Sequence, residues 1–168
     1  MNSMVKMVTN QKLLKQIFQR CLKENLFITS IESCTGGLIG AAITDIPGSS
    51  KIFEQGLITY SNKSKIELLG VSEENIQNHG AVSREVIIEM AVNPVVTQTR
   101  KNQITIATSG VAGPDQSENK PVGLIWLASY RKDNLIVKKI TLGNLNRTEI
   151  RQRTVSEALK LLNKNLKS

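Results

Sequence analysis

The residues best suited to catalysis lie in three short segments of the chain. The first, residues 32–37 (Glu-Ser-Cys-Thr-Gly-Gly), falls between a buried apolar run and a helical pattern. Small residues at such a strand-to-helix junction leave backbone N–H groups open to a phosphate or to the oxyanion of an acyl-transfer reaction. Ser33 stands where its hydroxyl could project from the end of the strand. The segment alone leaves a structural alternative open, in which Ser33 or Thr35 caps the helix and the glycines permit close packing.

The second segment, residues 60–65 (Tyr-Ser-Asn-Lys-Ser-Lys), offers groups that could accept a proton from a serine. A nucleophilic hydroxyl needs such a base, and a desolvated lysine or a tyrosine can take the place of histidine. The only histidine, His79, has no motif around it, so a Ser-His-Asp triad is not indicated. The alternative is that Tyr60 belongs to the core and that the lysines are ordinary surface charges.

The third segment, residues 109–114 (Ser-Gly-Val-Ala-Gly-Pro), follows a strand pattern and precedes a polar loop. Its glycines indicate backbone held close to a ligand, although a plain connection between strands would also explain the polar residues 115–119. Two other kinds of site are not indicated. Residues 35–40 have threonine where the dinucleotide fingerprint begins with glycine, and two cysteines with one histidine cannot supply a four-ligand zinc site.

The hydrophobic periodicity predicts helices and strands that alternate along the chain. Helices are expected at 10–25, 35–44, 64–69, 72–78, after an N-cap at Ser83, and after a capping box at 146–149. Strands are expected at 26–32, 51–60, 103–109, 122–130 and 135–142, the last nearest to an edge. Pro94 should kink or end its helix early. This order predicts an α/β fold, a three-layer α/β/α sandwich around one mostly parallel or mixed sheet, and leaves the strand order open.

The composition indicates one globular domain over residues 1–168, with 40% hydrophobic and 21% charged residues. No apolar run approaches the roughly 20 residues of a membrane span, and residues 1–15 lack the apolar stretch of a secretory signal, so we expect a cytoplasmic protein. Residues 131–168 hold ten Lys/Arg against three Asp/Glu, which is +7 of the net charge of +8. This excess coincides with an amphipathic helix pattern without interleaved aromatics, so a solvated basic face is favoured over a nucleic-acid surface.

Taken together, these segments resemble the C-terminal domain of the competence/damage-inducible CinA proteins, also known as stand-alone nicotinamide mononucleotide (NMN) deamidases. The resemblance spans most of residues 10–165, and its matching segments are 32–37, Asp45-Ile-Pro-Gly-Ser-Ser50, Thr59-Tyr-Ser-Asn62 with Lys65, Leu69-Gly-Val71, His79-Gly-Ala-Val-Ser83, 109–114 and Lys120-Pro-Val-Gly123. It implies a three-layer α/β/α domain that hydrolyses the carboxamide of NMN to nicotinate mononucleotide and ammonia, without a metal or redox cofactor. It also leads us to expect a homo-oligomer, with a dimer favoured.

On the same resemblance, Ser33 is the nucleophile, and Lys65, or Tyr60 tuned by Lys65, accepts its proton. The oxyanion is then stabilised by the backbone of Cys34, Thr35, Gly36 and Gly37, and water releases the acyl-enzyme. The residues expected to bind the substrate, including its ribose phosphate, are Ser109, Gly110, Ala112, Gly113, Arg147 and Arg151. The nucleotide-cleaving domain of longer relatives is not found in these 168 residues, so deamidase activity alone is expected.

Two departures from the family pattern bear on substrate fit. Residues 115–119 (Asp-Gln-Ser-Glu-Asn) contain no glycine and make a loop about one residue shorter than is common in the family. The family's Met-Ala-x-Gly reads Met-Ala-Val-Asn at residues 90–93, followed by Pro94. The alternative functions are a non-catalytic nucleotide-binding or regulatory module of the same fold, and an amidase that uses Cys34 as nucleophile, its thiolate favoured by the helix N-terminus.

Overall fold

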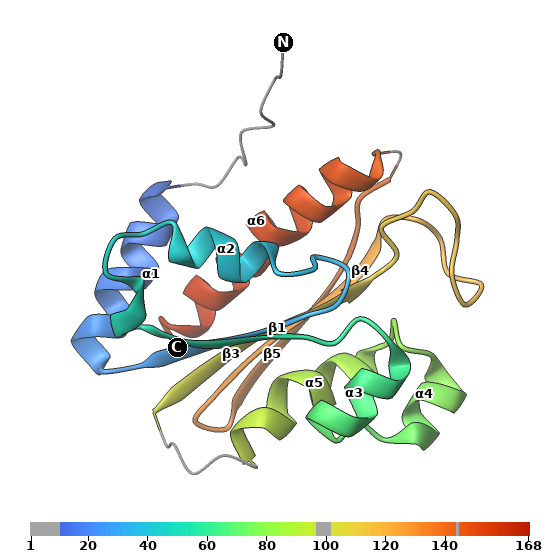
Figure 1. Ribbon diagram of the computed structural model, residues 1–168, viewed down its shortest axis with the longest axis horizontal. Coiled ribbons are helices and arrows are strands. Elements are labelled where there is room, and N and C mark those ends of the chain that lie inside the picture. The colour runs from blue at the N-terminus through green and yellow to red at the C-terminus, as the bar shows by residue number, and fades with distance from the viewer. Residues whose placement is uncertain (1–10, 97–101, 144) are drawn as a thin grey trace.

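The computed structural model describes residues 11–96, 102–143 and 145–168, and its centre is a five-stranded sheet (Figure 1). The strands are β1 (Phe27–Glu32), β2 (Phe53–Ile58), β3 (Gln103–Gly110), β4 (Leu124–Arg131) and β5 (Asn134–Thr141). They lie in the order β2-β1-β3-β4-β5. β1 pairs in parallel with both β2 and β3, whereas β3, β4 and β5 pair antiparallel. The sheet is therefore mixed, and β5 lies at an edge as predicted.

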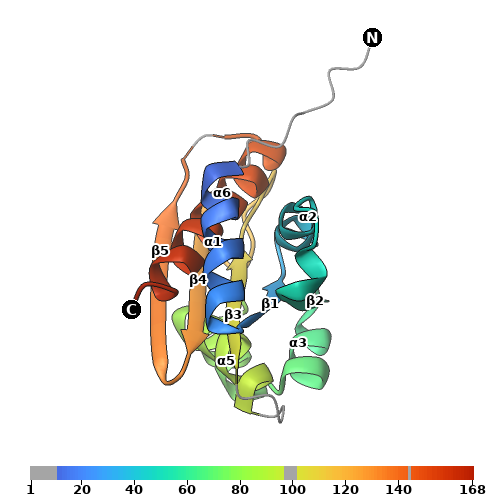
Figure 2. The same cartoon turned by 90° about the vertical axis from the view of Figure 1, so that its left-hand side faces the viewer.

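Helices cover both faces of this sheet and complete three layers, which Figure 1 and Figure 2 show from two sides. One face carries α1 (Gln11–Glu24), α2 (Leu38–Thr44) and α6 (Arg147–Asn165). The other carries α3 (Asn62–Leu69), α4 (Glu73–His79) and α5 (Arg84–Val96). A short 3-10 helix, η1 (Ser49–Lys51), precedes β2. The predicted α/β/α sandwich is confirmed.

Alternating side chains divide the core between the two faces of the sheet. On β3, Ile104 and Ile106 pack toward α1, α2 and α6, while Ala107 packs toward α5. Thr105 also faces α5, where its buried hydroxyl donates to the Ala91 carbonyl at 2.7 Å. The central strands are buried on both sides because helices cover both faces. Within the described ranges, no helix is both long and apolar enough to cross a membrane.

Most predicted elements are present, but two helix boundaries differ from the predictions. The helix expected from Thr35 begins at Leu38, because Gly36 and Gly37 have φ values of +59° and +94° and turn the chain before a helix can start. Pro94 was expected to kink or end its helix early, and the early end is not found, since α5 continues through Pro94 to Val96. Pro94 is buried, so the packing of its ring offsets part of the cost of the missing backbone hydrogen bond.

Two predicted helix caps are confirmed. Asn146 and Glu149 form a reciprocal capping box at the start of α6, with each side chain accepting from the backbone N–H of the other at 3.0 Å. The Ser83 hydroxyl accepts from the Val86 N–H at 3.3 Å and so caps α5. The start of each of these two helices is thus predicted correctly from a short local sequence pattern.

Candidate active site

Three strand ends that lie side by side bring the candidate residues together. β1 is the middle strand of the parallel trio, with Glu32 opposite Ile58 of β2 and opposite Thr108 of β3. The pairing continues past β1, since the Ser33 N–H donates to the Thr108 carbonyl (3.1 Å) and the Thr59 N–H donates to the Glu32 carbonyl (2.9 Å). Ser33 is therefore held between two neighbouring strand ends, at the edge where α/β proteins bind ligands.

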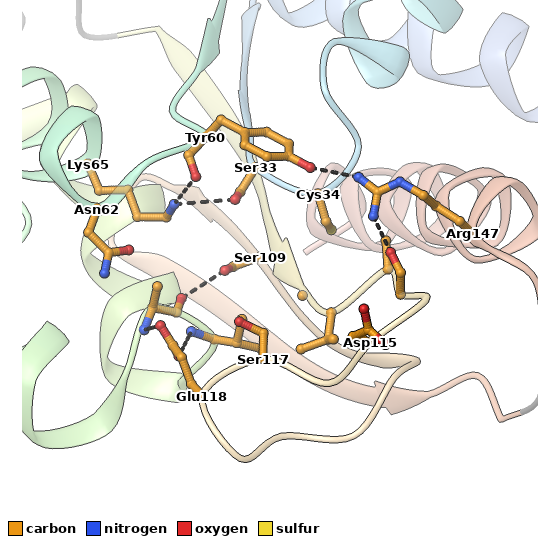
Figure 3. Close-up of a pocket in the computed structure, with 16 residues that line it drawn as sticks. Ser33, Cys34, Tyr60, Asn62, Lys65, Ser109, Asp115, Ser117, Glu118 and Arg147 are labelled. Carbon is orange, nitrogen blue, oxygen red and sulfur yellow. Dashed lines mark hydrogen bonds between the residues drawn. The ribbon is translucent and has the colours of Figure 1, made fainter.

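A cavity of about 270 Å³ opens at this edge (Figure 3). Its volume is near the lower end of the range for ligand sites, roughly 300–1,000 Å³. The predicted site residues that line it are Ser33, Cys34, Tyr60, Lys65, Ser109, Gly110, Ala112, Gly113 and Arg147. The predicted residues outside its lining are Thr35, Gly36, Gly37 and Arg151. Lining residues that sequence reasoning missed include Asn62, Asp115, Ser117 and Glu118.

Lys65 reaches the cavity from α3 and ends beside Ser33 (Figure 3). α3 begins with a capping box formed by Ser61 and Ser64. The side chain of Lys65 is only 1% exposed, and its Nζ contacts three oxygens. These are the carbonyl oxygens of Thr59 (2.9 Å) and Tyr60 (3.4 Å) and the hydroxyl oxygen of Ser33 (3.3 Å). The lysine predicted as a possible surface charge is thus a buried group of the site.

Burial disfavours the charged form of this lysine. Removal of water lowers the pKa of Lys65 from its usual 10.5, although the negative charge of Glu118 acts in the opposite sense. Lys65 Nζ donates to all three oxygens, and once the amine is neutral its lone pair can accept from the Ser33 hydroxyl. The surroundings of Lys65 therefore suit a general base that accepts the proton of Ser33.

The turn after β1 is held by Glu32, a residue that sequence reasoning did not single out. Its buried carboxylate accepts hydrogen bonds of 2.9–3.1 Å from the backbone N–H groups of Gly37, Ile39 and Gly40. Glu32 therefore caps α2, and the alternative that Ser33 or Thr35 does so is wrong. The position of a carboxylate at the end of a buried strand could have indicated this cap. A buried carboxylate needs several hydrogen-bond donors, and the N-terminus of the following helix supplies them.

The same contacts occupy two of the predicted oxyanion donors. The Gly37 N–H donates to Glu32, and the Gly36 N–H donates to the Ser33 carbonyl at 3.1 Å. By contrast, the N–H groups of Cys34 and Thr35 donate to no other residue in the part of the chain that the structure describes. Of these two residues only Cys34 lines the cavity, so the Cys34 N–H is the candidate donor for an oxyanion formed at Ser33.

Arg147 approaches the cavity from the start of α6 and pairs with Tyr60. Its guanidinium donates to the phenol oxygen of Tyr60 at 2.7 Å and to the carbonyl of Gly113 (Figure 3). The phenol of Tyr60 thus faces Arg147, while the contact between Tyr60 and Lys65 is made by the Tyr60 carbonyl. Arg147 and Arg151 were both expected to bind the substrate, and of these two arginines Arg147 lines the cavity.

Arg151, one turn further along α6, contacts the turn that carries Ser33. Its Nε donates to the Cys34 carbonyl at 3.2 Å, and its Nη2 donates to the Thr35 carbonyl at 2.8 Å. The contact is close, because a Cβ on Gly36 would lie 3.3 Å from Arg151 Nη2. Sequence reasoning assigned Arg151 to the substrate, whereas the structure directs its donors to the backbone.

Neither Cys34 nor His79 is suited to the role of a catalytic group. Burial raises the pKa of the Cys34 thiol to about 12, despite the opposing positive charges of Lys65 and Arg151, so the reactive thiolate is scarce near neutral pH. His79 ends α4 outside the cavity lining, with its Nδ1 4.0 Å from Glu85 Oε2.

No trio of His, Cys, Asp or Glu side chains among the described residues is arranged to hold a metal ion.

The loop that departs from the family pattern forms one wall of the cavity. Ser117 and Lys120 pair across a two-residue turn, in which Glu118 and Asn119 have φ values of +53° and +57°. The Glu118 carboxylate accepts from the backbone N–H groups of Ala81 (3.1 Å) and Val82 (3.4 Å). Although burial acts to raise it, these bonds and one from Lys120 hold the pKa of Glu118 below its usual value. This hairpin, residues 117–120, is thus tied to the segment before α5.

Comparisons with known proteins agree with one another. A model of the CinA C-terminal domain matches residues 10–166. A CinA-like protein of Endomicrobium trichonymphae is 44% identical over 155 residues, which cover 91% of this chain and 36% of the relative. The crystal structure of the competence/damage inducible protein CihA from Agrobacterium tumefaciens superposes with a TM-score of 0.87 and 37% identity, over 94% of this chain and 95% of that one. A CinA superfamily protein of Escherichia coli gives 0.85 and 26%, over 96% and 92%. The chain spans about two fifths or less of the length of the curated relatives it matches.

Proposed function

The chain belongs to the CinA C-terminal domain family, and on this premise we propose that it hydrolyses NMN to nicotinate mononucleotide and ammonia. One observation carries the proposal: the Ser33 hydroxyl lies 3.3 Å from the buried amine of Lys65 at an open cavity. A hydroxyl paired with a desolvated amine is a nucleophile and base that can cleave an amide without histidine. The choice of NMN rests on the resemblance of residues 32–37, 59–65 and 109–114 to the NMN deamidases.

In the first half-reaction, the neutral Lys65 amine takes the proton of the Ser33 hydroxyl while the serine oxygen attacks the carboxamide carbon. The carbonyl oxygen becomes an oxyanion, which accepts a hydrogen bond from the Cys34 N–H. The C–N bond then breaks, and the proton on Lys65 passes to the leaving nitrogen, which departs as ammonia. In the second half-reaction, water attacks the ester carbon and gives a proton to Lys65. The acid product leaves as that proton returns to the serine oxygen.

The contacts favour Lys65 over Tyr60 as the base. Lys65 Nζ is within hydrogen-bond reach of the Ser33 oxygen, whereas the Tyr60 phenol is bonded to Arg147. The role that suits Tyr60 is to orient the Arg147 guanidinium at the cavity wall. The resemblance offers Lys65 and Tyr60 as alternative bases, and in this proposal Lys65 is the base while Tyr60 orients Arg147.

Arg147 supplies the cation for the substrate phosphate. Two of its donors bind the uncharged oxygens of Tyr60 and Gly113, and the remaining N–H groups of the guanidinium can form stronger, charge-assisted hydrogen bonds with a phosphate. The backbone of Gly110 and Ala112 lines the same cavity, where small side chains allow a nucleotide to approach closely. The phosphate is therefore bound away from the α2 N-terminus, which Glu32 already caps.

The test is the release of ammonia and nicotinate mononucleotide by purified protein, with Ser33→Ala and Ser50→Ala as paired variants. Ser50 is exposed in η1 and does not line the cavity, so its hydroxyl is a matched control. We expect turnover in the wild type and in Ser50→Ala, and a loss of at least about a thousandfold in Ser33→Ala. Unchanged turnover in Ser33→Ala would remove the nucleophile, and an inactive wild type would refute the amidase.

The hairpin at residues 117–120 supports a second candidate, a module that binds a pyridine mononucleotide without cleaving it. In this hairpin the chain departs from the family pattern, and its Glu118 is fixed against the segment before α5. Under this alternative, titration calorimetry detects saturable NMN binding while no ammonia forms. Ordinary turnover of NMN would exclude it.

A further inference from the structure

The backbone of residues 33–37 has an uneven distribution of hydrogen bonds. The N–H groups of Gly36 and Gly37 are occupied inside the turn, while those of Cys34 and Thr35 bond to no other described residue. The residue after a nucleophilic serine is the usual source of an oxyanion donor at a strand-to-helix turn. Cys34 occupies that place, and it lines the cavity beside Ser33. The peptides next to Cys34 therefore have to be held in one orientation.

Arg151 is the side chain that holds them. Its Nε and Nη2 donate to the successive carbonyls of Cys34 and Thr35, at 3.2 and 2.8 Å, in the two-pronged geometry that a guanidinium offers and an ammonium does not. The Cys34 carbonyl belongs to the same peptide group as the Thr35 N–H. Arg151 therefore fixes the peptide that follows Cys34 and so limits how the backbone at Cys34 can turn.

Resting on the proposed function, we propose that Arg151 is a positioning residue of the reaction, which fixes the backbone directly after Cys34 so that the Cys34 N–H binds the oxyanion formed by attack of Ser33. Arg151 touches neither the serine oxygen nor the cavity. Its effect on the reaction passes through the backbone. Glu32 holds the other end of the same turn through the N–H groups of residues 37, 39 and 40, so the turn is fixed from the sheet and from α6.

This role differs in a measurable way from the binding of a phosphate. A phosphate ligand acts on the bound substrate and on the transition state alike, so its loss raises KM. An oxyanion donor acts as negative charge develops, so its displacement lowers kcat. The position of Arg151 behind the turn predicts the second outcome, and that of Arg147 at the cavity wall predicts the first.

The experiment measures kcat and KM for NMN in Arg151→Lys, Arg151→Ala and the matched control Arg153→Ala. Arg153 is exposed on the same helix and lies outside the cavity lining. We expect kcat to fall about 10- to 100-fold in both Arg151 variants, less than the 10²–10³ of losing a donor outright, with KM changed less than about threefold. Added guanidinium, far below denaturing concentrations, should restore part of kcat to Arg151→Ala alone. A raised KM with unchanged kcat, or a kcat equal to that of Arg153→Ala, overturns the proposal.

A second measurement separates this inference from the choice of substrate. A fluorophosphonate labels an activated serine through the same oxyanion donor but needs no nucleotide, so labelling of Ser33 should slow about 10- to 100-fold in the Arg151 variants. Titration of sites with this probe also corrects kcat for any unfolded fraction. If the wild type is labelled yet does not cleave NMN, only the proposed substrate fails. Labelling rates that are equal in wild type and Arg151→Ala overturn the positioning role, and a wild type that is neither labelled nor active overturns both.

Discussion

The amine nitrogen of Lys65 lies 3.3 Å from the hydroxyl oxygen of Ser33, although the two residues stand 32 positions apart in the chain. Two neighbouring strand ends create this contact. The Thr59 N–H bonds to the Glu32 carbonyl, which fixes the end of β2 beside Ser33, and α3 then returns Lys65 toward it. The nucleophile and the base of the proposed reaction are therefore placed by the parallel pairing of β1 and β2.

The pH dependence of kcat/KM should report the ionisation of Lys65. Burial lowers the pKa of Lys65 below 10.5, and the base must be neutral to accept a proton. Activity should therefore rise with pH through this lowered pKa and level off above it, well before free lysine would titrate. The measurement is a pH–rate profile of NMN turnover in the wild type. A profile that is flat, or that only falls over this range, would contradict a lysine base.

Replacement of Lys65 by methionine should trade activity for stability. Loss of the base should reduce turnover by at least about 10²-fold. The pKa of the buried amine is lower in the folded chain than in the unfolded chain, so the unfolded state binds more protons between the two pKa values. The free energy of unfolding of the wild type therefore increases as the pH rises from the lowered pKa toward 10.5. Lys65→Met should thus be more stable by about 0.5–2 kcal/mol near neutral pH, with a smaller gain at higher pH.

Urea unfolding of Lys65→Met and of the exposed control Lys63→Met, at neutral and alkaline pH, measures this difference. Lys63 is 80% exposed in its side chain and is near only Glu67 among its described ion-pair partners. The control should change stability by less than about 0.5 kcal/mol at either pH. A Lys65→Met protein less stable than the wild type at neutral pH would show that the amine stabilises the fold.

Tyr60→Phe should raise KM more than it lowers kcat. The variant loses the phenol oxygen that accepts from Arg147, so the guanidinium is held less well, while the Lys65–Ser33 contact is untouched. We expect an increase of about three- to tenfold in KM, equivalent to about 0.7–1.4 kcal/mol, which is the net contribution of one typical hydrogen bond. Steady-state kinetics on NMN decide the point. A kcat that collapses with an unaltered KM would instead make the Tyr60 phenol the proton acceptor.

Glu32→Gln should destabilise the protein and impair the site. The amide of glutamine places a donor against backbone N–H groups that the carboxylate accepts, which leaves buried groups unpaired. A loss of about 2–3 kcal/mol in the free energy of unfolding is expected, against less than about 0.5 for the exposed Glu67→Gln. Urea denaturation of the two variants measures it. Equal stability of the two would mean that the turn is held without Glu32.

Local features of this protein could be predicted from the sequence because one short segment decides each of them. The capping box at residues 146–149 and the amphipathic edge strand β5 are examples. The start of α2 could not be placed, because it depends on a carboxylate that accepts from N–H groups five to eight residues away. The contact of Arg151 with the turn joins residues more than a hundred positions apart, so no local pattern indicates it.

The grouping of Ser33, Tyr60 and Lys65 followed from the family resemblance of their motifs. Without the resemblance, the sequence is equally compatible with Lys65 as a surface charge and Tyr60 as a core residue. What the structure adds is the division of labour among them: the Lys65 amine contacts Ser33, whereas the Tyr60 phenol contacts Arg147. Such pairings depend on side-chain directions across separate elements, which spacing along the chain does not encode.

The hairpin at residues 117–120 gives side chains to the cavity wall but none of the atoms that form or break a bond in the proposed reaction. It is anchored through Glu118 and Lys120 to residues 79–82, apart from the turn that carries Ser33. The hairpin can therefore vary in sequence without moving the backbone that positions Ser33. Grafting a relative's hairpin that keeps an acidic residue at position 118 should change which ligand fits while the contact between Lys65 and Ser33 stays in place.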